Sequence, residues 1–112
     1  MAQRPQLGDL EELVLLTLLR LGPEAWGAGI REELRNRAGR SVSISTVYVT
    51  LMRMEEKGYV RSWKGEPSGE RGGKAKRHFE LLPEGVQVLE AVREIRDRMW
   101  DGLGVEDQAR AR

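Results

Sequence analysis

The sequence predicts a mainly α-helical fold with a small β-hairpin, arranged as a winged helix-turn-helix plus a C-terminal dimerisation helix. Three observations lead to this prediction. Four stretches repeat apolar residues at helical spacing. The third stretch begins with a capping serine and ends at a glycine. Two short strand-like segments then follow, joined by a long polar loop.

The first two helices are marked by leucine-rich and amphipathic patterns. The first is predicted over Gly8 to Arg20, and its leucines fall on nearly all sides, which indicates burial from more than one direction. In a small domain this pattern suggests a partner subunit, with Leu13 at the contact. The second helix is predicted over Trp26 to Arg37 and is ended by Gly39.

The third helix has the clearest signals for its start, its buried side and its end. Ser43 can accept a hydrogen bond from a free backbone N–H as the N-cap, and Gly58 ends the helix. Val47, Leu51 and Met54 recur at helical spacing and predict the buried side. The other side carries short hydroxyls that can bond to base edges or phosphates in a major groove. An amphipathic surface helix with a merely solvated polar face would show the same pattern.

A β-wing is predicted directly after this helix. Its strands span Tyr59 to Trp63 and Lys76 to Leu81, and the segment between them is rich in Gly, Pro, Ser and charge. From residue 53 to residue 77 the chain holds eight basic and four acidic residues, a local balance of +4 against a net charge of +1. This basic region indicates a surface that faces a polyanion.

The fourth helix is predicted from Pro83 to about Leu103 and carries the quaternary prediction. Its apolar residues are spaced by four, three and four positions, as in a coiled-coil seam. Burial of the whole stripe requires either a symmetric dimer or packing back onto the first helix. We expect a homodimer, with residues 1–82 as the DNA-binding domain, 83–103 as the dimerisation helix and 104–112 as a disordered tail. The predicted dimer interface comprises Leu13, Val88, Val92, Ile95, Met99 and Leu103.

Length and composition fit one small domain. The chain has 112 residues, 39% of them hydrophobic, and no cysteine, which excludes disulfides and thiolate metal sites. The longest apolar segment, Leu13 to Leu21, is too short to cross a bilayer and is interrupted by polar residues. We therefore expect a soluble, cytoplasmic protein without membrane association.

Three segments in order resemble the PadR family of winged-helix transcriptional regulators. Trp26-Gly27-Ala28-Gly29-Ile30 resembles the family's aromatic-Gly-aromatic-x-Ile opening of the second helix. STVYVTL and RMEEKG, over residues 45–58, are similar to the family's "GTLYPTL…RLEEKG". KRHFELLPEG, up to Gly85, is similar to its "RKYYRLTPEG". The resemblance covers about residues 10 to 89 and implies a compact member of the family.

The polar helix face, the basic wing and this resemblance together give a set of candidate DNA contacts. In similar proteins the tyrosine at the position of Tyr48 lies near the DNA backbone, although a core-edge aromatic is an equal interpretation. Basic residues late in the helix and on the wing suit phosphates better than bases, unless they only aid solubility. The predicted DNA-binding residues are Ser43, Ser45, Thr46, Tyr48, Thr50, Arg53, Lys57, Arg71, Lys74 and Lys76.

Departures from the family pattern bear on regulation and metal binding. Some relatives bind flat, aromatic, often cationic compounds through a tryptophan on the last helix. That position corresponds to Arg96, and Trp100 lies one turn further on. Trp100 is thus either a platform for a small aromatic effector or a dimer anchor, and we favour the anchor. Leu82 replaces the usual N-cap threonine, and His78, the only histidine, has no second histidine for a metal site. We expect neither metal nor cofactor.

An enzyme is not expected, because the sequence has no nucleophile motif and no phosphate loop. We expect a homodimeric regulator that binds a palindromic operator in double-stranded DNA, acts as a repressor and could respond to a ligand. The alternative is a winged helix that docks another protein, which acids near the third helix and wing would allow (Glu55, Glu56, Glu66 and Glu70). The absence of apolar anchors from the tip of the basic wing argues against docking.

Overall fold

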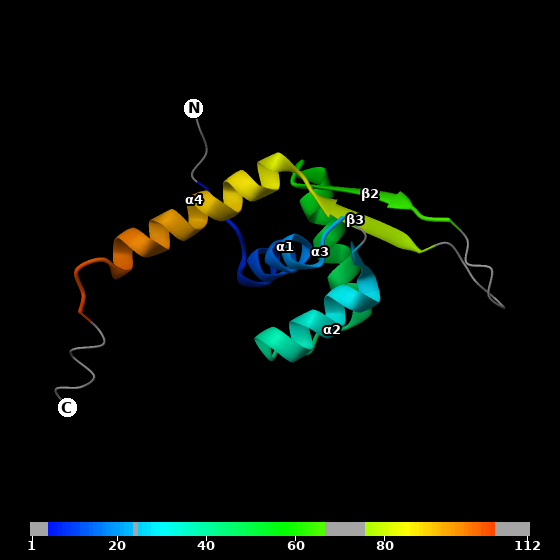
Figure 1. Cartoon of the computed structure of the whole chain (residues 1–112), viewed down its shortest axis with the longest axis horizontal. Coiled ribbons are helices and arrows are strands. Elements are labelled where there is room, and N and C mark those ends of the chain that lie inside the picture. Colours follow the sequence, from blue (N-terminus) through cyan, green and yellow to red (C-terminus); the bar gives the residue numbers. More distant parts are fainter. Residues whose placement is uncertain (1–4, 24, 67–75, 105–112) are drawn as a thin grey trace.

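The computed structural model describes residues 5–23, 25–66 and 76–104, and these form a cluster of helices with a hairpin on one side (Figure 1). The fourth helix leaves the cluster on the opposite side from the hairpin (Figure 1). The predicted combination of helices and wing is confirmed. In chain order the described elements are α1 (Asp9–Leu21), β1 (Ala25–Trp26), α2 (Gly27–Ala38), α3 (Ile44–Glu56), β2 (Val60–Lys64), β3 (Arg77–Leu81) and α4 (Pro83–Trp100).

The sheet contains one strand more than the predicted hairpin. Its antiparallel strands lie in the order β1-β3-β2, with Ala25 and Ser62 both opposite Phe79. We predicted β2 and β3 to within a residue or so at each end, but assigned Trp26 to the second helix. Strand β1 has only two residues, which is too short for period-two alternation to reveal it.

The core lies where α1, α2 and α3 meet the inner face of the sheet. Leu15, Ile30, Leu51 and Phe79 are almost fully buried there. Burial of each such side chain is worth about 1.5–3 kcal/mol relative to exposure. Because α1 is covered by α2, α3 and α4, its leucines are needed on several sides.

Both predicted ends of α3 are confirmed. The Thr46 backbone N–H donates to Ser43 Oγ at 3.1 Å. At the other end Gly58 has φ +82°, and the Tyr59 N–H donates to the Met54 carbonyl at 3.0 Å. A left-handed residue just after a helix favours glycine because it lacks a Cβ. These two terminal hydrogen bonds fix where the helix begins and ends, and therefore which of its side chains face outward.

Helix α4 divides into a packed half and a projecting half. Val88, Leu89 and Val92 belong to the common core, whereas Met99 is 73% exposed and Trp100 is 63% exposed. The helix ends at Trp100 and not at Leu103. Leu82 at the N-cap makes no side-chain cap bond, as its substitution for threonine predicts. Of the predicted tail, only Gly104 lies within the described residues.

Candidate nucleic-acid interface

The outward face of α3 is continuous and mixes hydroxyl, apolar and charged side chains. Ser45, Thr46 and Arg53 are exposed on it, as the amphipathic pattern predicts. Sequence reasoning missed two apolar members of this face, Val49 at 54% exposed and Met52 at 61% exposed. Both were visible as apolar residues outside the buried stripe. Such side chains can contact thymine methyl groups in a major groove.

Two predicted DNA-binding residues point inward. Thr50 is only 5% exposed, and its hydroxyl donates to the Thr46 carbonyl at 2.8 Å. Tyr48 is half-buried, with its ring centroid 5.9 Å from that of Phe79. A Cβ placed on Gly27 would lie 2.7 Å from the Tyr48 hydroxyl oxygen. Tyr48 therefore fills the space between α3 and the start of α2, which is the core-edge position that the sequence left open.

The acidic first turn of α1 lies beside this face. Arg53 Nη1 is 3.5 Å from Glu11 Oε2, and Arg40 Nη1 is 2.9 Å from Asp9 Oδ2. Residues of this turn and of α3, including Ser45, line a shallow hollow between the two helices. One arginine that we predicted to meet phosphates is thus held by a carboxylate of the same chain.

The wing is tied to α3 through one carboxylate. The Ser62 backbone N–H donates to Glu55 Oε2 at 3.1 Å, and the Ser62 hydroxyl donates to Glu55 Oε1 at 2.9 Å. These bonds fix the start of β2 relative to the end of α3. Glu55 was one of the acids that kept a protein-docking function open, and its carboxylate is instead used within the chain.

The basic wing residues lie partly within the described structure. Lys57 is exposed at the C-cap of α3, and Lys76 is exposed just before β3. Arg71 and Lys74 lie outside the described residues. Arg61, which we did not select, is exposed on β2 and forms a salt bridge with Glu80. Cations thus lie at the end of α3 and along the described part of the hairpin, where one of them is paired with Glu80.

The described residues contain no group of metal-ligating side chains, no unpaired buried polar side-chain atom and no membrane-spanning helix. No group of three His, Asp or Glu side chains there could hold a metal ion. Every buried polar side-chain atom in the same ranges has a hydrogen-bond partner. No helix in this part of the chain is long and apolar enough to cross a membrane.

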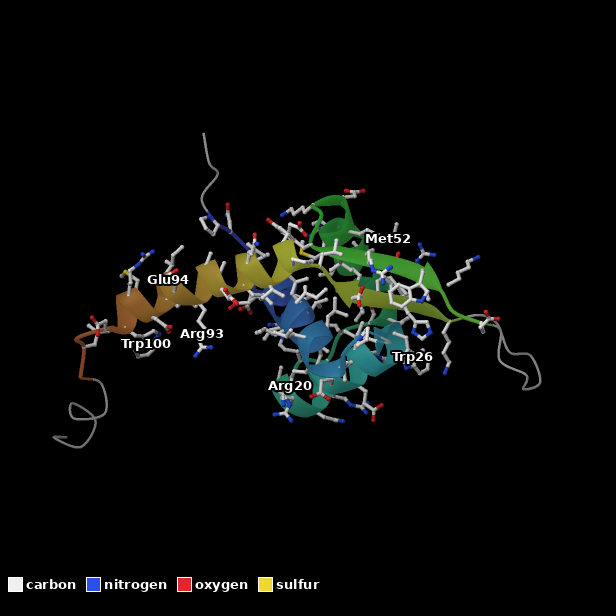
Figure 2. The ribbon with its side chains drawn as sticks, turned by 45° about the horizontal axis from the view of Figure 1, so that its top comes forward. Arg20, Trp26, Met52, Arg93, Glu94 and Trp100 are labelled. Carbon is white, nitrogen blue, oxygen red and sulfur yellow. The ribbon has the colours of Figure 1, made fainter. Side chains whose placement is uncertain are left out.

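A second surface, remote from α3, carries two of the predicted dimer residues and Trp100. Figure 2 shows Trp100 near the far end of α4, well away from Met52 and Trp26. Ile95, Met99 and Trp100 line a hollow together with Pro5 and Leu7 of the N-terminal segment. The other predicted dimer residues take different positions: Leu13 is half-buried on α1, Leu103 is exposed beyond the end of α4, and Val88 and Val92 are buried in the core.

The comparison with protein families gives a match over most of the chain. Residues 15–91 match the model described as "Transcriptional regulator PadR-like family". No significant match was found among curated proteins. The matched range contains α3, the wing and the first half of α4, so it includes the candidate interface described above.

Similar solved structures agree with this match. A PadR family transcription regulator from Clostridium difficile superposes with a TM-score of 0.69 at 23% identity, covering 90% of this chain and 99% of that one. A PadR family regulator from Eggerthella lenta gives 0.64 at 26% identity, with coverages of 86% and 83%. Bacillus subtilis PadR, solved with operator DNA, gives 0.62 at 25% identity, with coverages of 74% and 45%. With its winged-helix fold and its family match over residues 15–91, the chain belongs to the PadR-like family of transcriptional regulators.

Proposed function

We propose that this regulator binds duplex DNA sequence-specifically as a homodimer and represses transcription from a palindromic operator. The observation that carries the proposal is the continuous outward face of α3, capped at Ser43 and joined by Glu55 to a basic wing. It is supported by the Bacillus subtilis relative, which was solved with operator DNA.

In the proposed complex α3 enters the major groove. Ser45 and Thr46 at its exposed N-terminal end suit hydrogen bonds to base edges or phosphates, and Val49 and Met52 suit apolar contacts with thymine methyl groups. Lys57 and the described wing cation Lys76 contact the backbone, as do Arg71 and Lys74 of the wing loop. Thr50 is left out of direct contact, because its hydroxyl is buried and already bonded. Tyr48 packs against Phe79 and Gly27 beneath the outward face of α3.

The second copy is proposed to cover the projecting half of α4. Met99 and Trp100 are exposed there, as is Leu103 just beyond the end of the helix, and α1 exposes Leu16 and Leu19. A single small domain leaves these apolar groups in water, whereas a two-fold axis buries two copies of the same patch. The two α3 helices of such a dimer enter successive major grooves, about 34 Å apart.

Trp100 is proposed to anchor this dimer interface. Its indole is mostly exposed at the end of α4 and lines a hollow with Met99 and Ile95, as an interface anchor would. The second role proposed for Trp100 is to stack against a flat aromatic effector. Such an effector would act by favouring one relative arrangement of the two α3 helices in the dimer. Titration of the dimer with such a compound, followed by tryptophan fluorescence, tests this role.

A protein-docking module receives less support. Glu55 on α3, one of the four acids that allowed it, is bonded to Ser62. Glu80 on β3, which was not among the four, is paired with Arg61. The exposed apolar residues of α3 do remain a possible docking surface, because Val49 and Met52 are both more than half exposed. The DNA experiment below separates the two functions, since a docking module needs no duplex.

The test is selection from a random duplex library, followed by anisotropy titration of the enriched duplex across a salt series. We expect a palindrome with half-sites about 10 base pairs apart. The plot of log K against log[salt] should have a slope of about −4 to −7, because each neutralised phosphate contributes about −0.9. Lys76→Met should flatten this slope. No enrichment and no binding at low salt would refute the DNA-binding function and leave the docking module.

A further inference from the structure

The outer face of the sheet carries a row of three ring side chains. Trp26 lies directly opposite His78 on β3, and His78 lies directly opposite Trp63 on β2. Side chains alternate between the two faces of a strand, so this row faces away from buried Phe79. The Trp63 and His78 ring centroids are 5.8 Å apart. Figure 2 shows Trp26 beside the hairpin strands.

A cation lies over the ring at each end of this row, but the two cations differ in their other partners. Lys76 Nζ is 3.9 Å from the centre of the Trp26 ring, and Arg61 Cζ is 4.6 Å from the centre of the Trp63 ring. Arg61 also donates a hydrogen bond to Glu80. Within the described ranges Lys76 forms no salt bridge.

A backbone hydrogen bond fixes the main chain at Lys76. The Gly65 N–H donates to the Lys76 carbonyl at 2.7 Å, which joins the two strands of the hairpin just beyond the last pair of the ladder. A lysine at such a position would ordinarily sample many side-chain conformations. The indole face under its ammonium restricts that freedom while leaving the charge intact.

We propose that Trp26 is a positioning residue that holds the Lys76 ammonium where the paired strands end and the wing loop begins, ready for a DNA phosphate. The inference rests on the proposed DNA-binding function and assigns a role to a residue outside α3 and outside the wing loop. Trp26 attracts the ammonium from one side, and the other side stays open to an anion. The lysine side chain is thus already ordered before DNA binds, so the binding free energy is not reduced by the entropy cost of ordering it.

Trp26 also belongs to β1 and precedes α2, so its substitution could weaken DNA binding merely by disturbing the fold. The test is therefore a double-mutant cycle on the enriched duplex, with Trp26→Leu, Lys76→Met and the double variant. We expect Trp26→Leu to weaken binding by about 2- to 5-fold per protomer, the strength of an exposed cation–π pair. In the Lys76→Met background the same change should have almost no effect. Trp26→Phe, which keeps a ring, should restore most of the affinity.

Trp63→Leu is the matched control, because it makes the same change at the other end of the row. Arg61 keeps its carboxylate partner there, so the effects of Trp63→Leu and Lys76→Met should multiply independently. Equal loss from Trp26→Leu in both lysine backgrounds would show a purely structural role and overturn the inference. Unchanged binding by Lys76→Met would also overturn it, while the DNA-binding function stands. A parent chain that binds no duplex would overturn both.

Discussion

Neutralising Glu11 should strengthen DNA binding, because this carboxylate holds Arg53 beside the outward face of α3. The pair is separated by 3.5 Å, with the Glu11 side chain 12% exposed and that of Arg53 55% exposed. Because the arginine is largely in water, solvent screening limits the pair to about 0.2–1 kcal/mol. Glu11→Gln removes this competing partner and one negative charge near the approaching phosphates.

From this magnitude we expect Glu11→Gln to tighten binding by roughly 1.4- to 5-fold per protomer, which is the same free energy expressed as an affinity ratio. If the released Arg53 then contacts a phosphate, the salt slope should steepen by about 0.9 for each protomer. Anisotropy titration of the enriched duplex at several salt concentrations measures both quantities. The thermal midpoint should change little, since the ion pair itself is weak and a glutamine can still accept the Gly8 N–H bond that Glu11 Oε1 accepts at 2.7 Å.

The neighbouring residue provides the control. Glu12 lies in the same turn of α1, but its carboxylate accepts a hydrogen bond from Arg96 of α4 at 3.1 Å. Glu12→Gln makes the same chemical change without freeing an α3 arginine, so DNA affinity should rise less than in Glu11→Gln, and the slope should stay near that of the parent. If both variants bind alike, a general loss of negative charge explains the effect. If Glu11→Gln binds no more tightly than the parent, the competition argument is refuted.

Three further variants test the N-cap of α3, the packing of Tyr48 and the proposed dimer contact of Trp100. Ser43→Ala should lower the free energy of unfolding by about 1 kcal/mol in urea titration, because Thr46 loses its capping acceptor. A Ser45→Ala control should change it by much less. Gly27→Ala should cost about 1–3 kcal/mol, since its Cβ would overlap the Tyr48 ring; an unchanged urea midpoint would contradict that packing. Trp100→Ala should weaken the dimer in sedimentation equilibrium without unfolding it, and an unaltered association constant would remove Trp100 from the interface.

The parts of the fold that depend on local chemistry could be predicted from the sequence. Ser43 as a cap and Gly58 as a stop act within a few residues of themselves, so their roles can be seen in the sequence alone. The bonds from Ser62 to Glu55 could not be anticipated, because they depend on how β2 turns back along α3. Strand β1 was missed for the same reason, since two residues become a strand only by pairing with β3.

For the candidate site, helical spacing predicts which side of a helix is apolar but not which neighbouring side chains turn inward. Helical spacing correctly separated the stripe of Leu51 from the polar side, but Thr50 lies next to that stripe and its short side chain turned inward to bond the Thr46 carbonyl. On α4 the spacing predicted an apolar seam without showing what covers it. The structure divides that seam: Val92 is packed in the core, and Met99 is exposed. Periodicity identifies an apolar face, whereas the partner of that face depends on the rest of the fold.

The first turn of α1 forms ion pairs toward both proposed surfaces, the DNA-binding face of α3 and the dimerisation half of α4. Its acids suit a helix N-terminus, where the backbone dipole favours negative charge. Each of them is also paired with a cation from a different element: Asp9 with Arg40 before α3, Glu11 with Arg53 on α3, and Glu12 with Arg96 on α4. Because these carboxylates share one turn, a large displacement of α4 in the proposed dimer would move α1 with it or lengthen the Glu12–Arg96 pair. In the proposed dimer, movement of α4 would then reach α3 through the Glu12–Arg96 and Glu11–Arg53 pairs, whose carboxylates belong to adjacent residues.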